Sequence, residues 1–402
     1  MFLKNFIGID KQADLKISIV GGSNSVIRKG YTKYLERDLG EITEQATSLQ
    51  YYALGGVPNI FGLIQQNRFD IALRSDIIFY EYCVNDRHIV ELEQYSLELA
   101  GKSLEGFIRK CQKSNPNCLI VILIFGVNQD NYYQNPCALS ELYESIADYY
   151  SLPVVNITAL LREKSGLSFI KSLYGDKDDA HYTRPHGVQI VSQLIIEELQ
   201  QQGIINILKF RLNQYSSVNK SLQPIYEDNF VNLAFFENFD RVNVFASEPK
   251  VSVFQNTVFR EKSFTLYQDN ALKFLLKGRL AAIFIKSDPN DGFVKINFNS
   301  QQIVTSSYSA WISKLRPQNI TMITLPLLRF APSQDFSPAS ISLCEEYPDN
   351  FELDYFKDEP AKINPQKWKL SVIGIAYIGE IRSSFNLSSI KQDNKLDCLN
   401  SN

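Results

Sequence analysis

Residues 15–25 read Leu15-Lys16-Ile17-Ser18-Ile19-Val20-Gly21-Gly22-Ser23-Asn24-Ser25. The apolar run from Ile17 to Val20 predicts a short buried strand. Two glycines directly after it predict a tight turn, because glycine tolerates backbone angles that other residues avoid. A turn of small residues at the end of a strand lifts the Ser23 hydroxyl above the edge of a sheet. The stretch therefore predicts an α/β fold with reactive groups at the carboxyl ends of its strands.

The same alternation continues to about residue 205. Further strands are predicted at 49–54, 76–84, 119–125 and 153–155. Helical spacing of apolar residues predicts helices at 31–39, around 104–111, at 139–150 and around 188–199. Strands that alternate with helices predict a parallel sheet covered on both faces.

The pattern changes after Gln200-Gln201-Gln202-Gly203, and residues from about 225 to 385 are rich in strand-forming runs. Phe293 to Phe298 alternates with period two and follows Leu280 to Ile285 across the turn 288–292, which predicts a hairpin. Such spacing is typical of an antiparallel sandwich. For 402 residues we expect two domains, residues 1–205 and a β-rich accessory domain at 206–402.

Composition excludes several classes of protein. The formal net charge of −3 offers no basic surface for nucleic acid. The cysteines form no CxxC pair, which argues against a zinc or redox motif, and free thiols fit a reducing compartment; they are Cys83, Cys111, Cys118, Cys137, Cys344 and Cys398. The first residues lack a signal-peptide pattern, and the longest apolar run, 118–127, is too short to span a membrane. We therefore expect a cytoplasmic protein without a membrane span.

Two further segments follow predicted strands and carry polar or flexible residues. Gly55 and Gly56 follow the second strand, where glycine lets the backbone approach a ligand and present an N–H group. Asn85 follows the third strand and can aim its amide at a developing negative charge. Glu81 is unusual inside an apolar strand and needs a partner if it is buried.

A fourth segment, Asp178-Asp179-Ala180-His181, precedes the last amphipathic helix. A histidine acting as a base needs one tautomer held in place, and a carboxylate three residues earlier supplies that. The other two histidines, His88 and His186, fit surface or capping positions. Ser23 and His181 together favour serine-based acyl-ester chemistry.

Taken in order, the four segments resemble the conserved blocks of the SGNH (GDSL-type) hydrolase family, which carry a Ser, a Gly, an Asn and a His. The resemblance covers roughly residues 15–202 and implies a flavodoxin-like three-layer sheet. It implies Ser23 as nucleophile, His181 as general base and Asp178 as its orienter. Ser23, Gly56 and Asn85 would form the oxyanion hole. Two assignments stay open, with Ser25 as an alternative nucleophile and Gly55 as an alternative to Gly56; Gly22 replaces the family's Asp in the first block.

The resemblance implies an enzyme that acts on acyl groups, most simply the O-acetyl groups of a carbohydrate or polysaccharide, through an acyl-enzyme. One hypothesis is an esterase that needs no cofactor. An alternative is a polysaccharide O-acetyltransferase with acetyl-CoA as donor, which a cytoplasmic location would favour. A third is a non-catalytic glycan-binding protein on a hydrolase scaffold. The sequence leaves the choice between them, and the oligomeric state, open.

The C-terminal half carries no comparable motif. Residues 288–292 have some spacing of a calcium loop but lack its ligands, so we expect a turn. Trp311 and Trp368 fit either stacking on sugars or packing in a core, and core packing is the commoner role.

Overall fold

The computed structural model describes residues 14–135, 137–210, 222–237, 239, 249–256, 258–310, 319–355, 357–360 and 364–383. Trp311 and Cys398 lie outside these ranges. The chain divides into two compact units. One comprises residues 1–90 and 96–231, and the other comprises residues 91–95 and 232–402.

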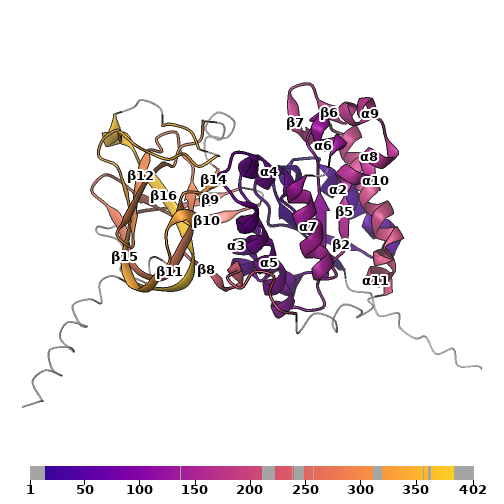
Figure 1. Ribbon diagram of the computed structural model, residues 1–402, viewed down its shortest axis with the longest axis horizontal. Helices are drawn as coiled ribbons and strands as arrows, with labels where there is room; N and C mark the ends of the chain where they lie inside the picture. Colours follow the sequence, from indigo (N-terminus) through magenta and orange to yellow (C-terminus); the bar gives the residue numbers. More distant parts are fainter. Residues whose placement is uncertain are drawn as a thin grey trace, which may run out of the picture. The chain divides into compact units, whose positions relative to one another are not determined.

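The first unit alternates strands and helices (Figure 1). Its strands are β1 (Leu15–Gly21), β2 (Thr47–Tyr51), β3 (Ile77–Glu81), β4 (Leu119–Ile124), β5 (Val154–Asn156), β6 (Tyr174–Gly175) and β7 (Asp178–Tyr182). Its helices are α1 (Ser23–Val26), α2 (Tyr31–Thr43), α3 (Ile60–Phe69), α4 (Cys83–Glu91), α5 (Leu97–Ser114), α6 (Asp130–Gln134), α7 (Ala138–Tyr149), α8 (Ile157–Lys164), α9 (Leu167–Ser172), α10 (His186–Gln201) and α11 (Ile204–Phe210), with a 3-10 turn η1 (Ile71–Arg74).

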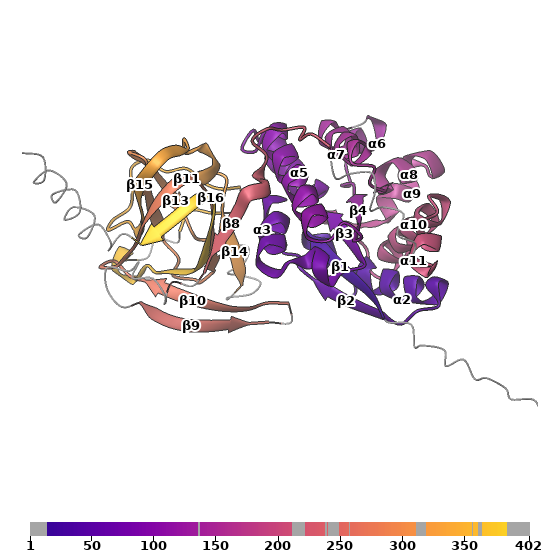
Figure 2. The ribbon, with the colours of Figure 1, turned by 90° about the horizontal axis from the view of Figure 1, so that it is seen from below.

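A five-stranded parallel sheet in the order β2-β1-β3-β4-β5 forms the middle layer of this unit. Helices α2, α8, α10 and α11 cover one face, and α3, α5 and α7 cover the other (Figure 2). The inner strands β3 and β4 are apolar along almost their whole length because both faces are buried. The predicted flavodoxin-like three-layer fold is confirmed.

One predicted strand is shorter than its apolar run. We predicted a strand from residue 76 to 84, but β3 ends at Glu81 and α4 begins at Cys83. Asn85 therefore lies in the first turn of a helix rather than in a loop. Tyr82, Cys83 and Val84 are all buried. A short continuous apolar run fits a buried strand and a buried helix equally well, so hydrophobic periodicity could not distinguish the two.

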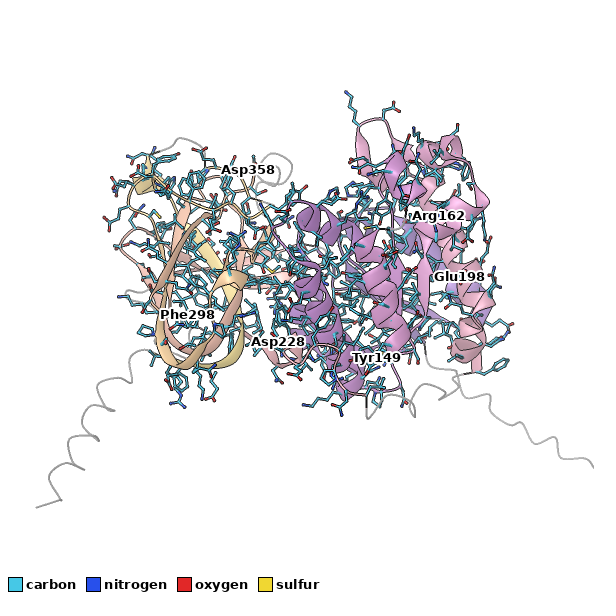
Figure 3. The ribbon with its side chains drawn as sticks, in the orientation of Figure 1. Tyr149, Arg162, Glu198, Asp228, Phe298 and Asp358 are labelled. Carbon is cyan, nitrogen blue, oxygen red and sulfur yellow. The ribbon has the colours of Figure 1, made fainter. Side chains whose placement is uncertain are left out.

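The first unit extends past the boundary that we predicted at residue 205. Backbone N–H groups of Ile225 and Tyr226 donate to the Glu105 carboxylate on α5, at 2.6 and 2.9 Å. The hydroxyl of Tyr149, at the end of α7, donates to the Gln223 carbonyl at 3.0 Å (Figure 3). These contacts place residues 222–231 on the helices of the first unit, and the division falls at residue 231.

The second unit is β-rich, as predicted. Its elements are β8 (Leu233–Phe236), β9 (Lys250–Gln255), β10 (Arg260–Leu266), β11 (Ala271–Lys286), β12 (Phe293–Phe298), β13 (Gln301–Ser306), β14 (Ile320–Ile323), β15 (Ser333–Leu343) and β16 (Leu370–Ser383), with short 3-10 turns η2 (Phe230–Asn232), η4 (Leu327–Arg329) and η5 (Pro365–Lys367). The strands form one hydrogen-bonded sheet of nine antiparallel strands. Gly278 and Gly379 face each other in the long pair β11–β16 with φ of 120° and 117°, a conformation that favours glycine.

The predicted hairpin between residues 280–285 and 293–298 is wrong. The end of β11 pairs with β14 and β16, whereas β12 pairs with β13 and β15. The tight hairpin joins β12 to β13 through Asn299 and Ser300, both with positive φ, as a type I′ turn requires. The segment 288–292 is a turn, as expected, closed by hydrogen bonds between Asp288 and Asp291.

Aromatic side chains fill the core of the second unit. Trp368 is fully buried between Phe293 and Tyr347, with ring centroids 5.7 and 5.1 Å away. Phe298, labelled in Figure 3, packs edge-on against Phe330. Trp368 is therefore a core residue and not a platform for stacking on sugars.

Candidate active site

The four sequence segments meet at the carboxyl edge of the parallel sheet. β1 lies between β2 and β3, so the chain leaves β1 and β3 at the point where the strand order reverses. Open α/β sheets bind their ligands in the crevice at such a point. Ser23 follows β1 and Asn85 follows β3, while Gly55 and Gly56 follow β2.

The side chains of Ser23, His181 and Asp178 form a hydrogen-bonded chain. Ser23 Oγ lies 2.7 Å from His181 Nε2. His181 Nδ1 lies 2.9 Å from both carboxylate oxygens of Asp178. The exposed fraction is 24% for the His181 side chain and 50% for that of Asp178, so solvent reaches this chain of groups.

Local backbone geometry fixes the Asp178–His181 pair. Asp178 Oδ1 accepts the backbone N–H groups of Ala180 and His181, at 3.2 and 3.0 Å. Because His181 lies three residues after Asp178, the same carboxylate binds the backbone of its own turn and the imidazole ring. The pair lies on β7, which the sequence placed only as a segment before the last helix.

A residue that the sequence analysis did not single out joins the two halves of the site. Asn24 Nδ2 donates to the Ala180 carbonyl at 2.9 Å, and Asn24 is 6% exposed. This bond ties the Ser23 turn directly to the strand that carries His181. Its only sequence signal was its place beside Ser23, which does not reveal a partner more than 150 residues away.

Glycines in the first two segments allow close backbone packing. A Cβ atom on Gly22 would lie 2.4 Å from Asn85 Oδ1, and one on Gly55 would lie 3.1 Å from Ser23 Cβ. Gly56 has a φ of 71°, which favours glycine. A Cβ atom at position 22 would therefore require the Asn85 side chain to shift.

Asn85 is held in place by a hydrogen bond from its Nδ2 to the Val57 carbonyl, at 2.8 Å. An amide nitrogen carries two hydrogens, so this bond orients the group while leaving one N–H for a ligand. Ser23 is the first residue of α1, a single helical turn of four residues. Individual N–H groups, rather than a helix dipole, are thus available beside Ser23.

Ser25, the alternative nucleophile, points away from His181. It is 1% exposed, its Oγ donates to Glu81 Oε2 at 2.9 Å, and it lies 3.1 Å from the Tyr31 hydroxyl. Glu81 is fully buried, which raises its pKa to about 8 against the opposing effect of its hydrogen bonds. A buried glutamate needs a partner, and for Glu81 that partner is Ser25.

A second buried carboxyl group, that of Asp86, anchors the helix that carries Asn85. Asp86 accepts the backbone N–H of Asn59 at 2.8 Å and the hydroxyl of Tyr143 at 2.5 Å. Burial raises the pKa of Asp86 to about 7. These bonds connect the start of α3, α4 and α7, so the residue next to Asn85 anchors its helix.

The remaining candidates lie elsewhere. His186 is the exposed first residue of α10, and His88 lies within α4. Among the residues that the structure describes, no group of three or more His, Cys, Asp or Glu side chains is arranged to hold a metal ion. No helix in the described ranges is long and apolar enough to cross a membrane.

Comparison with known proteins gives a likeness of fold. No protein-family model and no curated protein matches this chain by sequence. Among solved structures, a two-domain esterase active on acetylated mannans, crystallised with mannopentaose, matches with a TM-score of 0.64 and 13% identity, over 91% of this chain and 92% of that one. Another structure of that esterase matches over the same shares, with a TM-score of 0.62 and 14% identity.

A putative GDSL-like lipase from Parabacteroides merdae covers 48% of this chain and 98% of its own, with 15% identity and a TM-score of 0.41. The two structures of the two-domain esterase each match over nearly the whole chain. The predicted fold, a parallel α/β sheet followed by a β-rich domain, is confirmed. At these identities the likeness concerns the fold alone.

Proposed function

We propose that the chain is a serine-dependent esterase that removes O-acetyl groups from a carbohydrate. The observation that carries this proposal is the hydrogen-bonded chain from Asp178 through His181 to Ser23, with contacts of 2.9 and 2.7 Å. A hydroxyl, an imidazole and a carboxylate in this order activate a serine for attack on an ester.

In the proposed reaction, Ser23 Oγ attacks the acetyl carbonyl while its proton passes to His181 Nε2. Asp178 accepts the Nδ1–H of the imidazole and stabilises the positive charge that forms on it. The tetrahedral oxyanion receives hydrogen bonds from the backbone N–H groups of Ser23 and Gly56 and from Asn85 Nδ2.

Collapse of this intermediate breaks the bond to the sugar oxygen, which takes the proton from His181 Nε2 and leaves as a hydroxyl. The acetyl group stays on Ser23 Oγ as an ester. Water then attacks that ester, gives its proton to His181, and acetate departs as Ser23 regains its proton. His181 accepts and returns every proton of the cycle, and water is the second substrate. The reaction therefore needs no cofactor.

Carbohydrate is proposed as the substrate because the two-domain esterase that matches over 91% of this chain is active on acetylated mannans. Nothing in these comparisons favours the O-acetyltransferase that would use acetyl-CoA. A glycan-binding protein without activity would not require the serine, imidazole and carboxylate to align. The cytoplasmic location stays a prediction from the sequence.

The test is covalent labelling of the purified chain with a fluorophosphonate probe, followed by peptide mass spectrometry, beside measurement of acetate released from acetylated mannooligosaccharides. We expect an adduct on Ser23, absent from Ser23→Ala and from His181→Ala. Ser145→Ala, an exposed serine on α7, is the matched control and should label as the parent does. Acetate release that persists in folded Ser23→Ala would overturn the proposal.

A further inference from the structure

Glu81 lies directly beneath the Ser23 turn. It is the last residue of β3 and pairs with Gly21 at the end of β1. Its backbone carbonyl accepts the N–H of Gly22 at 2.8 Å, and its side chain is fully buried. The residue that precedes Ser23 is thus attached to β3 through the backbone of Glu81.

The carboxyl of Glu81 makes a second attachment to the same turn. Ser25 Oγ donates to Glu81 Oε2 at 2.9 Å, and the Tyr31 hydroxyl lies 3.1 Å from Ser25 Oγ. A serine hydroxyl has one hydrogen, so when Ser25 donates it to Glu81, Tyr31 donates to Ser25. Glu81 Oε1 has no hydrogen-bond partner among the described residues.

Such surroundings favour the uncharged acid. Burial raises the pKa of Glu81 to about 8, and nearby Asp86 raises it further, against the lowering effect of Ser25 and the Gly22 N–H. Burial raises the pKa of the hydroxyls of Tyr31, Tyr82 and Tyr182, and charge on Glu81 would raise it further.

No cationic side chain contributes to the pKa shift of Glu81. A buried carboxylate without a positive partner is costly, so Glu81 is mainly protonated at neutral pH.

An apolar residue at position 81 would continue β3 without the free-energy cost of burying an acid. Leucine at this position would remove the carboxyl acceptor of the Ser25 hydroxyl, leaving it only the Tyr31 hydroxyl as a partner, and would release one of the two attachments of the turn. We propose that the buried carboxyl of Glu81 is a positioning residue, which holds residues 22–25 so that Ser23 Oγ stays within hydrogen-bond reach of His181. The inference rests on the proposed function, because it concerns the same serine.

A pH dependence follows from this arrangement. When Glu81 ionises, one hydroxyl and one backbone N–H do not replace the water that a carboxylate loses on burial. The turn then relaxes to admit solvent, and Ser23 moves relative to His181. Misplacement of a reacting atom by about 1 Å can lower a rate on the order of a hundredfold. Turnover should therefore fall, reversibly, as the pH rises through about 8.

The experiment compares Glu81→Leu, Glu81→Gln and the parent in the hydrolysis of 4-nitrophenyl acetate between pH 6 and 9.5, with spontaneous hydrolysis subtracted. Asp291→Asn removes a fully buried carboxyl of the second unit, whose pKa is also raised, and is the matched control. Asp86→Asn tests whether the other buried carboxyl of the site causes the alkaline fall. Thermal unfolding shows which variants are folded.

We expect Glu81→Leu to lower kcat about tenfold to a hundredfold, with KM within about twofold of the parent. Glu81→Gln, which keeps an acceptor for Ser25 but cannot ionise, should recover turnover relative to Glu81→Leu and lose the alkaline fall. Asp291→Asn should keep that fall at the parent's pH, and Asp86→Asn should keep it at a lower pH, because the charge of Asp86 no longer raises the pKa of Glu81. An alkaline fall in Glu81→Gln equal to that of the parent would overturn the inference, even if Glu81→Leu does not fold.

The two proposals fail in different ways. Turnover that survives in Ser23→Ala removes the proposed function, and the positioning role with it. Loss of turnover in Ser23→Ala, together with parental kcat and pH profile in folded Glu81→Leu, leaves the proposed function standing and removes the positioning role alone.

Discussion

Replacing Asp178 by asparagine tests how much the carboxylate contributes to the proposed reaction. The substitution keeps the size of the side chain and an oxygen for the backbone N–H groups of Ala180 and His181. It removes the negative charge that faces the imidazole. It also puts an N–H₂ group in place of one of the two carboxylate oxygens that lie 2.9 Å from His181 Nδ1, which favours the wrong imidazole tautomer.

The size of the effect follows from the exposure of the pair. Opposite charges about 4 Å apart attract by about 1 kcal/mol in water and about 4 kcal/mol near a protein surface. Because Asp178 is 50% exposed and His181 is 24% exposed, we take a value of roughly 2 kcal/mol between these limits. This corresponds to a loss of about thirtyfold in kcat, since about 1.4 kcal/mol is one factor of ten.

The assay is kcat for 4-nitrophenyl acetate at neutral pH, beside the rate of fluorophosphonate labelling of Ser23, with circular dichroism to establish folding. Both rates should fall by similar factors because both depend on activation of Ser23. Rates within about twofold of the parent in folded Asp178→Asn would refute the assignment of Asp178 as the orienter of His181.

Three further predictions concern the groups around Ser23. Gly22→Ala places a Cβ 2.4 Å from Asn85 Oδ1, so Asn85 must move, and kcat should fall about tenfold or more while the unfolding midpoint changes little; an unchanged kcat would contradict the role of Asn85. Asn24→Ala removes the bond to the Ala180 carbonyl and should cost about 1–2 kcal/mol in urea unfolding, together with a lower kcat; parental values of both would show that this link is dispensable. The raised pKa of Glu81 means that the folded state binds more protons than the unfolded state between pH of about 4.5 and 8, so its contribution to stability is lost as pH rises through that window. The melting temperature of Glu81→Gln minus that of the parent should therefore grow from pH 5 to pH 8, and a constant difference would argue against a protonated Glu81.

Patterns in the sequence were sufficient for the parallel sheet and for the segments that form the site. A buried parallel strand is apolar on both faces, so β1 and β4 were visible as continuous apolar runs. Ser23 and the Asp178–His181 pair stood out because small residues and isolated histidines are conspicuous beside such runs. Chain order then placed each group at the same edge of the sheet.

Local patterns were less informative where pairing is long-range. The run 280–285 could pair with any apolar strand, and only the fold selects β14 and β16 as its partners. The hairpin turn is the pair Asn299 and Ser300 between β12 and β13, and not the longer turn that we chose. Register and partner choice in an antiparallel sheet depend on contacts between segments far apart in the chain.

Ser23 and Ser25 show most clearly which properties follow from the sequence and which follow only from the tertiary structure. By itself the sequence determined that a serine turn, a glycine turn, an asparagine and an Asp–His pair follow apolar segments in a fixed order. The tertiary structure alone decided that Ser23 faces His181, that Ser25 turns inward to Glu81, and that Asn24 joins two strands. The direction in which a side chain points, and its hydrogen-bond partner, depend on packing in three dimensions. Ser23 and Ser25 carry the same hydroxyl group, and only the fold gives them different neighbours.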